Sequence, residues 1–289
     1  ETSSFQLETV IDFRPKISAI LNITPDHLNR HHTMENYIRV KEDISKNQDE
    51  NDFCILNYED VILREFAKNV KAKVVFFSSK TKLEKGFYLD NDIIVKTENG
   101  KVSEILDTKK LNILGRHNYE NVMAAIAIAE SYGVPMENIV KSCYDFHAVE
   151  HRIEFVKEVN GVKYYNDSKG TNPDAAIQAV LAMPSFTYII AGGYDKGSEY
   201  DEWIESFGGK VKKLILMGAT AKNIADCANR HGFKDIGMVN SMEEAVNICA
   251  REAKSGEYVL LSPACASWGM FKNYEERGRI FKDCVKELR

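Results

Sequence analysis

Two histidines and a lysine near the start of the chain have a spacing that suggests metal binding. In the segment TPDHLNRHH, His27 and His31 are four residues apart, which on a helix would place both imidazoles on one face, and Lys41 follows 14 residues after His27. The segment has no HExxH glutamate and no evident third ligand. The spacing alone therefore favours a solvated loop, and a metal pair is the less favoured alternative.

A second group combines the segments HRIEFV and NDSKGTN. Arg152 and Lys169 are suited to phosphate or carboxylate, Arg through paired hydrogen bonds and Lys as a point charge, and Asp167 at a strand end could accept from ribose hydroxyls. The alternative is that Asp167 simply turns the chain and Pro173 opens the next helix. Two basic groups beside a turn slightly favour ligand binding.

The segment GRHNYEN places Asn118 and Asn121 at the start of a predicted helix. Asparagine is among the best N-cap residues, so capping is the favoured interpretation. The alternative is that this helix terminus and its amide side chains face a nucleotide.

The segment GGYDKGS is a glycine-rich turn that contains Lys196. It matches neither GxxxxGK[ST] nor GxGxxG, so the glycines are expected to shape the loop rather than to cradle a phosphate.

The segment SPACASWGMFKNYEERG has small residues that would let a ligand approach the backbone, followed by a helix whose N-terminal N–H groups could face an anion. Cys265 has no histidine near it in sequence. A buried, packed cysteine is therefore favoured over a nucleophile.

Bulk properties limit the class of protein. The 289 residues suggest two domains, and 44% hydrophobic content with a net charge of -5 is ordinary for a globular protein with no polybasic surface for nucleic acid or membrane. The six cysteines form no CxxC pair, and no apolar run approaches the ~20 residues of a membrane span. We expect a cytoplasmic protein. Because ETSSFQLE begins within structured sequence and without Met, we also expect a fragment or a processed chain.

The first half of the chain predicts strands that alternate with helices, as in a parallel sheet. A patch at 86–113 with Asn-Gly at 99–100 predicts antiparallel strands. The predicted strands are 16–24, 52–58 and 72–79, and the predicted helices are 35–47, 61–69, 118–132 and one from Met136.

In the second half, strands alternate with helices predicted from Pro173, near 200, from Thr220 and from Met242, which predicts a doubly wound, Rossmann-like domain. The five predicted strands are YYND, TYIIAGG, KKLILMG, DIGMV and YVLLSP. We place the division between the domains at 148/149, giving 1–148 and 149–289. Such sheets bind ligands at the carboxyl ends of their strands, which is where NDSKGTN, GGYDKGS and SPACAS occur.

The order of these motifs, from ETSSFQLE through LNITPDHLNRH to SPACASWGMFKNYEERG, closely resembles the Mur ligases over the whole chain. The resemblance implies an α/β fold: the remainder of a P-loop-type central ATPase domain, then a Rossmann-like C-terminal domain that binds the incoming amino acid. Sister enzymes tend to have DYAHxP or DGAHNP where this chain has NDSKGTNP, and the DNPR signature of the diaminopimelate-adding member is absent. That difference implies the addition of D-glutamate to UDP-N-acetylmuramoyl-L-alanine.

The resemblance also implies roles for individual residues. Glu1 and His27 would hold Mg²⁺, and His27 would act in catalysis with Lys41, which would react with carbon dioxide to form a carbamate that supplies the hard oxygen ligands Mg²⁺ prefers. ATP would contact Asn118, Asn121, Arg152 and Asp167; the acceptor would contact Ser3 and Gln6; D-glutamate would contact Lys169, Thr171, Lys196, Ser267 and Tyr274.

The implied reaction forms an acyl phosphate on the acceptor, in peptidoglycan precursor synthesis, and so serves cell-wall biogenesis, cell shape and cell division. The chain has no match to the family's UDP-binding domain or P-loop, so we expect it to be inactive alone, and we expect a monomer. Gly269 stands where the family often has Asp, and Tyr274 where Phe is common. The alternatives are a folylpolyglutamate synthetase-like ligase and a non-catalytic nucleotide-binding fragment.

Overall fold

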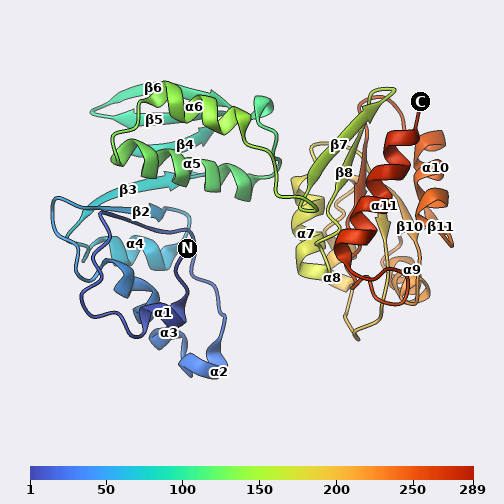
Figure 1. Ribbon diagram of the computed structural model, residues 1–289, viewed down its shortest axis with the longest axis horizontal. Helices are drawn as coiled ribbons and strands as arrows, with labels where there is room; N and C mark the ends of the chain where they lie inside the picture. The colour runs from blue at the N-terminus through green and yellow to red at the C-terminus, as the bar shows by residue number, and fades with distance from the viewer. The chain divides into compact units, whose positions relative to one another are not determined.

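The computed structural model describes residues 1–289 and has two compact units (Figure 1). Unit 1 comprises Glu1–Leu111 and Arg116–Phe146, and unit 2 comprises Asn112–Gly115 and His147–Arg289. The main division thus falls at 146/147, two residues before the position placed from sequence. The short segment 112–115 joins unit 2 because Asn112 forms a β-bridge with His147.

Unit 1 is built on a six-stranded sheet in the order β1-β2-β3-β4-β5-β6. The first four strands are parallel and the last two pairings are antiparallel, which confirms the predicted change of texture. The turn between β5 and β6 has positive φ at Asn99 (52°) and Gly100 (75°), as the Asn-Gly hairpin signal requires. The strands are β1 Ile17–Ile20, β2 Phe53–Asn57, β3 Lys73–Ser78, β4 Gly86–Asp90, β5 Ile93–Glu98 and β6 Lys101–Asp107.

The helices of unit 1 include a long one, α5, that packs against β1 to β4 through its apolar, Ala-rich face. The predicted helix 35–47 is shorter than expected, because α3 ends at Glu42 and the chain continues as a 3-10 turn over Asp43–Ser45. The α-helices are α1 Ser4–Leu7, α2 Leu28–His31, α3 Met34–Glu42, α4 Val61–Ala67, α5 Arg116–Ser131 and α6 Met136–Asp145, with a second 3-10 turn at Thr108–Lys110.

Unit 2 has a six-stranded sheet in the order β11-β10-β9-β12-β8-β7. Its five parallel strands are those predicted, but the edge strand β7 was missed and pairs antiparallel with β8. The β7–β8 turn is a second Asn-Gly pair, Asn160-Gly161, with φ of 54° and 78°. The strands are β7 Glu154–Val159, β8 Val162–Asn166, β9 Thr187–Ala191, β10 Val211–Leu216, β11 Ile236–Met238 and β12 Tyr258–Leu261.

Helices cover both faces of this sheet, so its central strands are apolar on both sides. Ile189 belongs to the core beneath α7, α8 and α9, whereas its neighbour Ile190 belongs to the core beneath α10 and α11. No helix in either unit combines the length and apolarity needed to cross a bilayer. The helices are α7 Pro173–Ala182, α8 Asp201–Glu205, α9 Ala221–Arg230, α10 Met242–Glu252 and α11 Tyr274–Glu287.

Candidate functional site

The strand order of unit 2 creates a switch point at which a ligand site is expected. After β8 the chain crosses to β9, then builds β10 and β11 outward, and finally returns to insert β12 between β8 and β9. The carboxyl ends of β8, β12 and β9 are therefore adjacent, and Rossmann-like sheets bind ligands at such positions. The loops NDSKGTN, SPACAS and GGYDKGS follow these three strands.

Asp167 lies at the centre of this edge and is buried. Its carboxylate accepts hydrogen bonds from the Ser262 hydroxyl (2.8 Å) and the Ile153 amide (3.3 Å), while its own amide donates to the Leu261 carbonyl (2.7 Å). Burial outweighs these bonds and raises the pKa of Asp167 to about 7. The side chain can therefore change its charge near neutral pH.

The loop that contains Arg152 has a strained backbone. His151 and Ile153 have φ of 67° and 45°, and positive φ is unusual for a β-branched residue such as isoleucine. Both side chains are buried, and the His151 carbonyl accepts a hydrogen bond from the Lys169 amide (3.0 Å). The exposed Arg152 between them is thus held on a fixed backbone beside Asp167 and Lys169, as strained functional loops often are.

Arg277 is a buried residue of this edge whose role the sequence interpretation did not identify. Its guanidinium donates to the Ser168 hydroxyl (3.0 Å), the Ser168 carbonyl (2.8 Å) and the Cys265 carbonyl (3.0 Å). Burial lowers its pKa to about 10. It lies four residues before the buried Phe281 and eight before the buried Val285 on α11, and this spacing could have revealed that it faces the core. The side chain joins the loops after β8 and β12.

The glycines of GGYDKGS shape the loop, as predicted. A Cβ at Gly192 would lie 2.1 Å from the Met217 carbonyl oxygen, and one at Gly193 would lie 2.3 Å from the Ala266 carbonyl oxygen. Their backbones therefore approach neighbouring loops in a way that no other residue allows. Beyond them, the Lys196 ammonium lies 5.0 Å from the centre of the exposed Trp268 ring.

Four further predicted residues lie around the same edge. The Lys169 ammonium lies 6.0 Å from the centre of the Tyr274 ring, and the Thr171 amide donates to the Lys169 carbonyl (2.9 Å). The Ser168 hydroxyl donates to the Tyr274 carbonyl (2.7 Å), which fixes the start of α11. Ser267 is buried and its carbonyl accepts from the Phe271 amide (3.0 Å).

Cys265 is packed rather than activated, as expected from its sequence context. Its sulfur contacts the Tyr200 hydroxyl (3.2 Å) and the Thr220 hydroxyl (3.3 Å), and burial raises the pKa of the thiol. A raised pKa disfavours the thiolate that a nucleophile requires.

In unit 1, a chain of ring contacts links Lys41 to His27. The Lys41 ammonium lies 5.7 Å from the centre of the Tyr37 ring, and the centres of the Tyr37 and His31 rings are 5.3 Å apart. The Phe5 ring lies between the two histidines, with its centre 5.9 Å from that of His31 and 4.8 Å from that of His27. Residues from α1, the start of α2 and α3 thus form one cluster.

The placement of His27 and His31 on one helical face is wrong. His27 precedes α2 as its N-cap, with a left-handed φ of 52°. His31 is buried, and its ring nitrogens contact the Ser4 hydroxyl (3.0 Å) and the Glu8 carboxylate (3.2 Å). A His27–His31 metal pair is therefore disfavoured, because both His31 nitrogens already have partners.

Ser3 and Gln6 are joined in a capping box at α1. The Ser3 hydroxyl accepts from the Gln6 amide (3.3 Å), and the Gln6 side-chain oxygen accepts from the Ser3 amide (2.8 Å). Glu1 is exposed and precedes this box.

The capping interpretation of Asn118 and Asn121 is also wrong. Helix α5 begins at Arg116, so these residues occupy its third and sixth positions, inside the helix. An N-cap must precede the first helical residue. The two asparagines lie three apart and so on neighbouring positions of one helical face.

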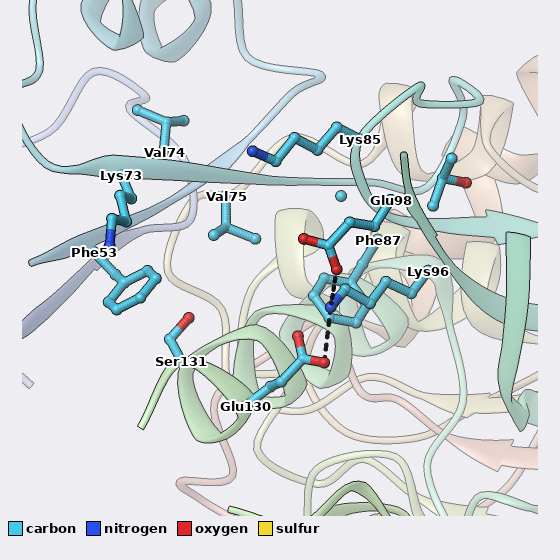
Figure 2. Close-up of a pocket in the computed structure, with 12 residues that line it drawn as sticks. Phe53, Lys73, Val74, Val75, Lys85, Phe87, Lys96, Glu98, Glu130 and Ser131 are labelled. Carbon is cyan, nitrogen blue, oxygen red and sulfur yellow. Dashed lines mark hydrogen bonds and ion pairs between the residues drawn. The ribbon is translucent and has the colours of Figure 1, made fainter. Parts of the chain in front are cut away.

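The pocket drawn in Figure 2 has a volume of about 430 Å³ and lies in unit 1. None of the predicted site residues lines it. The Lys96 ammonium in this pocket forms ion pairs with the carboxylates of Glu98 (3.0 Å) and Glu130 (2.9 Å), so this positive charge already has partners within the protein.

Comparisons with known proteins identify both units. The Mur ligase middle domain matches residues 1–129, and the Mur ligase glutamate ligase domain matches residues 151–265. Proteins named UDP-N-acetylmuramoylalanine–D-glutamate ligase match the whole chain at 56% identity in Lachnospira eligens and 50% in Clostridioides difficile. The chain spans 64% of the length of each of these relatives.

Solved structures share the fold at low identity. UDP-N-acetylmuramate–alanine ligase MurC from Thermotoga maritima has a TM-score of 0.66 at 17% identity, covering 98% of this chain and 61% of that one. FolC from E. coli has a TM-score of 0.60 at 15% identity, covering 94% and 62%. With two domain models matched in order and relatives similar along its entire length, the chain belongs to the Mur ligase family.

Proposed function

We propose that the chain belongs to an ATP-dependent amide ligase that adds D-glutamate to UDP-N-acetylmuramoyl-L-alanine in the cytoplasm, as a monomer, in peptidoglycan precursor synthesis. The observation that supports this most directly is the 56% identity, over 100% of the chain, to relatives with that name. FolC shares only the fold at 15% identity, so no specific observation favours a folate ligase.

In this proposal unit 1 is the ATPase domain and binds the acceptor. Ser3 and Gln6 contact the muramoyl-alanine end, and Asn118 and Asn121 contact ATP. The capping box fixes the Ser3 and Gln6 side chains, which supports a positioned rather than a mobile contact.

Glu1, His27 and carbamylated Lys41 would hold Mg²⁺. The donor set fits, because carboxylate and carbamate oxygens are the hard ligands that Mg²⁺ prefers. The Lys41 ammonium faces the Tyr37 ring and forms no ion pair, so no carboxylate has to be displaced before the amine reacts with carbon dioxide. Mg²⁺ supplies neutralising charge for the phosphates when bound.

Unit 2 is proposed to bind D-glutamate and part of the nucleotide. Lys169, Lys196 and Ser267 offer cationic and hydroxyl groups suited to carboxylates, with Thr171 and Tyr274 beside them. Arg152 and Asp167 would contact ATP, Asp167 through ribose hydroxyls. All seven residues lie in the loops at the carboxyl edge of the sheet or at the adjoining start of α11.

The proposed reaction has two displacements. An oxygen of the L-alanine carboxylate attacks the γ-phosphorus and ADP leaves, which forms an acyl phosphate. The amino group of D-glutamate then attacks the carbonyl carbon, inorganic phosphate leaves and the nitrogen loses a proton. The Lys and Arg side chains position the reactants and stabilise the negative charge that develops.

The test compares variants of the complete gene product with UDP-N-acetylmuramoyl-L-alanine, ATP and D-glutamate. Lys41→Ala is expected to lose roughly 100-fold or more in rate, and added acetate or formate should restore part of it by replacing the carbamate. Lys71→Ala removes an exposed lysine of the same unit and is the control. Unchanged activity of Lys41→Ala refutes the carbamate role, and a preference for L-glutamate refutes the proposed substrate.

A further inference from the structure

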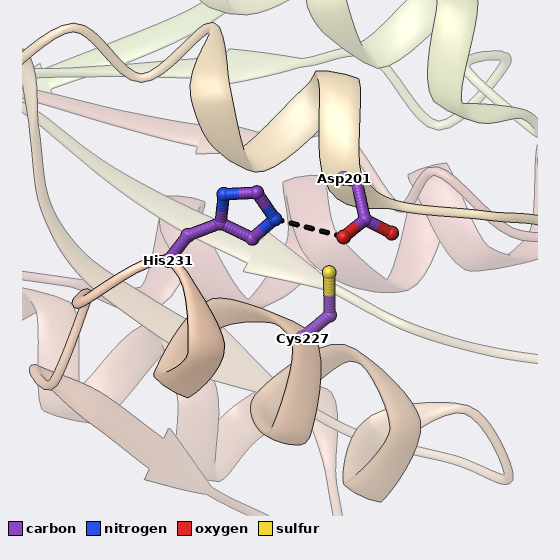
Figure 3. Close-up of side chains that lie close together, drawn as sticks. All are labelled: Asp201, Cys227 and His231. Atoms are coloured by element: carbon purple, nitrogen blue, oxygen red, sulfur yellow. Dashed lines mark hydrogen bonds and ion pairs between the residues drawn. The ribbon is translucent and has the colours of Figure 1, made fainter.

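A cluster of three side chains in unit 2 is not used by the proposed reaction. Asp201 is the first residue of α8, Cys227 lies in α9, and His231 is the C-cap of α9 (Figure 3). One ligand atom from each lies within 4.8 Å of the others, and His231 Nε2 is 2.8 Å from Asp201 Oδ1. Figure 3 shows the sulfur and the imidazole directed toward the same carboxylate.

The helical spacing explains why these groups meet. Cys227 and His231 are four residues apart, so both lie on the side of α9 that contacts α8. Cys227 is buried, whereas the His231 side chain is 25% exposed and that of Asp201 is 48% exposed. The cluster therefore has a sealed base and an opening through which an ion can enter.

The remaining imidazole nitrogen also has an acidic neighbour. Glu205, one turn after Asp201 on α8, places a carboxylate oxygen 3.6 Å from His231 Nδ1. In the present structure Nε2 donates its proton to the Asp201 carboxylate. When an ion takes the Nε2 lone pair, that proton would move to Nδ1, which faces the Glu205 carboxylate, as second partners do for metal-ligating histidines. The Arg230 guanidinium lies 3.4 Å from Asp201 Oδ1, and its positive charge would repel a bound cation only from the solvent-exposed side of the cluster.

We propose that Asp201, Cys227 and His231 form a site for a thiolate-preferring divalent cation, with Zn²⁺ as the type and water as a fourth ligand. Thiolate, imidazole and carboxylate are the ligand types that Zn²⁺ takes in proteins, and thiolate disfavours Mg²⁺ and Ca²⁺. Tetrahedral Zn²⁺ needs donor atoms roughly 3.5 Å apart. The present hydrogen bond need only open by about 0.7 Å, within the reach of small rotations of two partly exposed side chains.

Binding exchanges one proton for the ion. The Cys227 thiol releases its proton to the solvent, and the thiolate and the Asp201 carboxylate together balance the two positive charges of the cation. The bound ion would join the start of α8 to the end of α9. Since Asp201 lies five residues after Lys196, it would also fix the far end of the loop that contains Lys196.

The experiment titrates the complete gene product with Co²⁺, which reports thiolate ligation by an absorption band in the near ultraviolet. One equivalent is expected to bind at micromolar concentration or below, Zn²⁺ is expected to abolish the band, and both ions should raise the melting temperature. Cys227→Ser and His231→Gln should each lose the band. Asp201→Asn should weaken binding at least about 10-fold, because it removes a charged ligand.

The matched control is Cys284→Ser, a half-buried cysteine outside the cluster, which should keep the full signal. Circular dichroism of each variant establishes that it is folded; because His231 is partly exposed at a helix end, His231→Gln decides the question if Cys227→Ser does not fold. A wild-type protein with no charge-transfer band, or a band that survives both Cys227→Ser and His231→Gln, overturns the site. Neither outcome depends on ligase activity.

Discussion

The Ser262 hydroxyl donates a 2.8 Å hydrogen bond to Asp167, although 95 residues separate the two in sequence. They meet because β12 inserts next to β8, so the residues that follow these two strands lie side by side. The hydroxyl satisfies one carboxylate oxygen, but it does not compensate for burial, and the pKa of Asp167 is raised to about 7. This pair couples the charge of the candidate site to the stability of unit 2.

The raised pKa predicts a pH dependence of folding. A carboxyl group whose pKa is higher in the folded state takes up a proton on folding between the unfolded value of about 3.8 and the folded value of about 7. Its contribution to the free energy of unfolding is therefore largest below pH 4 and is lost as the pH rises to 7. Measured by urea unfolding, the wild type should lose stability relative to Asp167→Asn across this range.

The comparison needs an exposed carboxylate as its control. Asp283→Asn removes a side chain that is 71% exposed, and the difference between this variant and the wild type should change little with pH. A constant difference between the wild type and Asp167→Asn would contradict the raised pKa.

Arg277 should be the residue of α11 that is most sensitive to loss of its head group. Arg277→Met leaves two backbone carbonyls and a hydroxyl without their buried donor, and we expect the free energy of unfolding to fall by about 3–5 kcal/mol. Arg277→Lys keeps the positive charge but loses the planar set of donors, so its free energy of unfolding should lie between those of the wild type and Arg277→Met. The exposed Arg279→Met should stay within about 0.5 kcal/mol in the same urea titration. Equal losses for both methionine variants would show that the hydrogen bonds of Arg277 to Ser168 and Cys265 do not stabilise unit 2.

The sequence predicted the elements that are locally determined. Fully buried strands such as Thr187–Ala191 and Tyr258–Leu261 are continuous apolar runs, so they were found. Strand β7, with its mixed EFVKEV, is at an edge and partly exposed, so its apolar pattern is weak. The Asn160-Gly161 pair that follows it was the feature of the sequence that could have predicted the β7–β8 hairpin.

The long-range parts of the site could not be predicted in this way. The role of Arg277 depends on partners 109 residues away, and that of Ser262 on the insertion of β12 between β8 and β9. The position of Asn118 inside α5 depends on where the helix begins, and helix boundaries are the least certain feature of a sequence pattern.

Gly278 tests how tightly α11 packs on the strained loop. At an exposed position inside a helix, Gly→Ala adds about 1 kcal/mol of stability. At Gly278, however, an added Cβ would lie 2.2 Å from His151 Nδ1. We expect Gly278→Ala to lower the melting temperature because His151 must shift from its contact with Asn166 (2.9 Å). In a double-mutant cycle, His151→Ala with Gly278→Ala should be less destabilised than the sum of the single changes. Strict additivity would show that the two residues do not compete for space.

Lys196 should control the affinity for the incoming amino acid if the proposed function holds. Lys196→Met removes a charge-assisted hydrogen bond to a carboxylate, worth about 1.5–3 kcal/mol, so the KM for D-glutamate should rise by about 10- to 100-fold while the KM for ATP stays the same. Trp268→Leu removes only the ring that the ammonium faces at 5.0 Å, and should shift the same constant less. Lys222→Met, which removes an exposed lysine paired with Asp226, is the control. A rise in the KM for D-glutamate alone cannot come from a folding defect, because a folding defect would not affect one substrate selectively. An unchanged KM for D-glutamate in Lys196→Met would place the amino-acid carboxylates elsewhere.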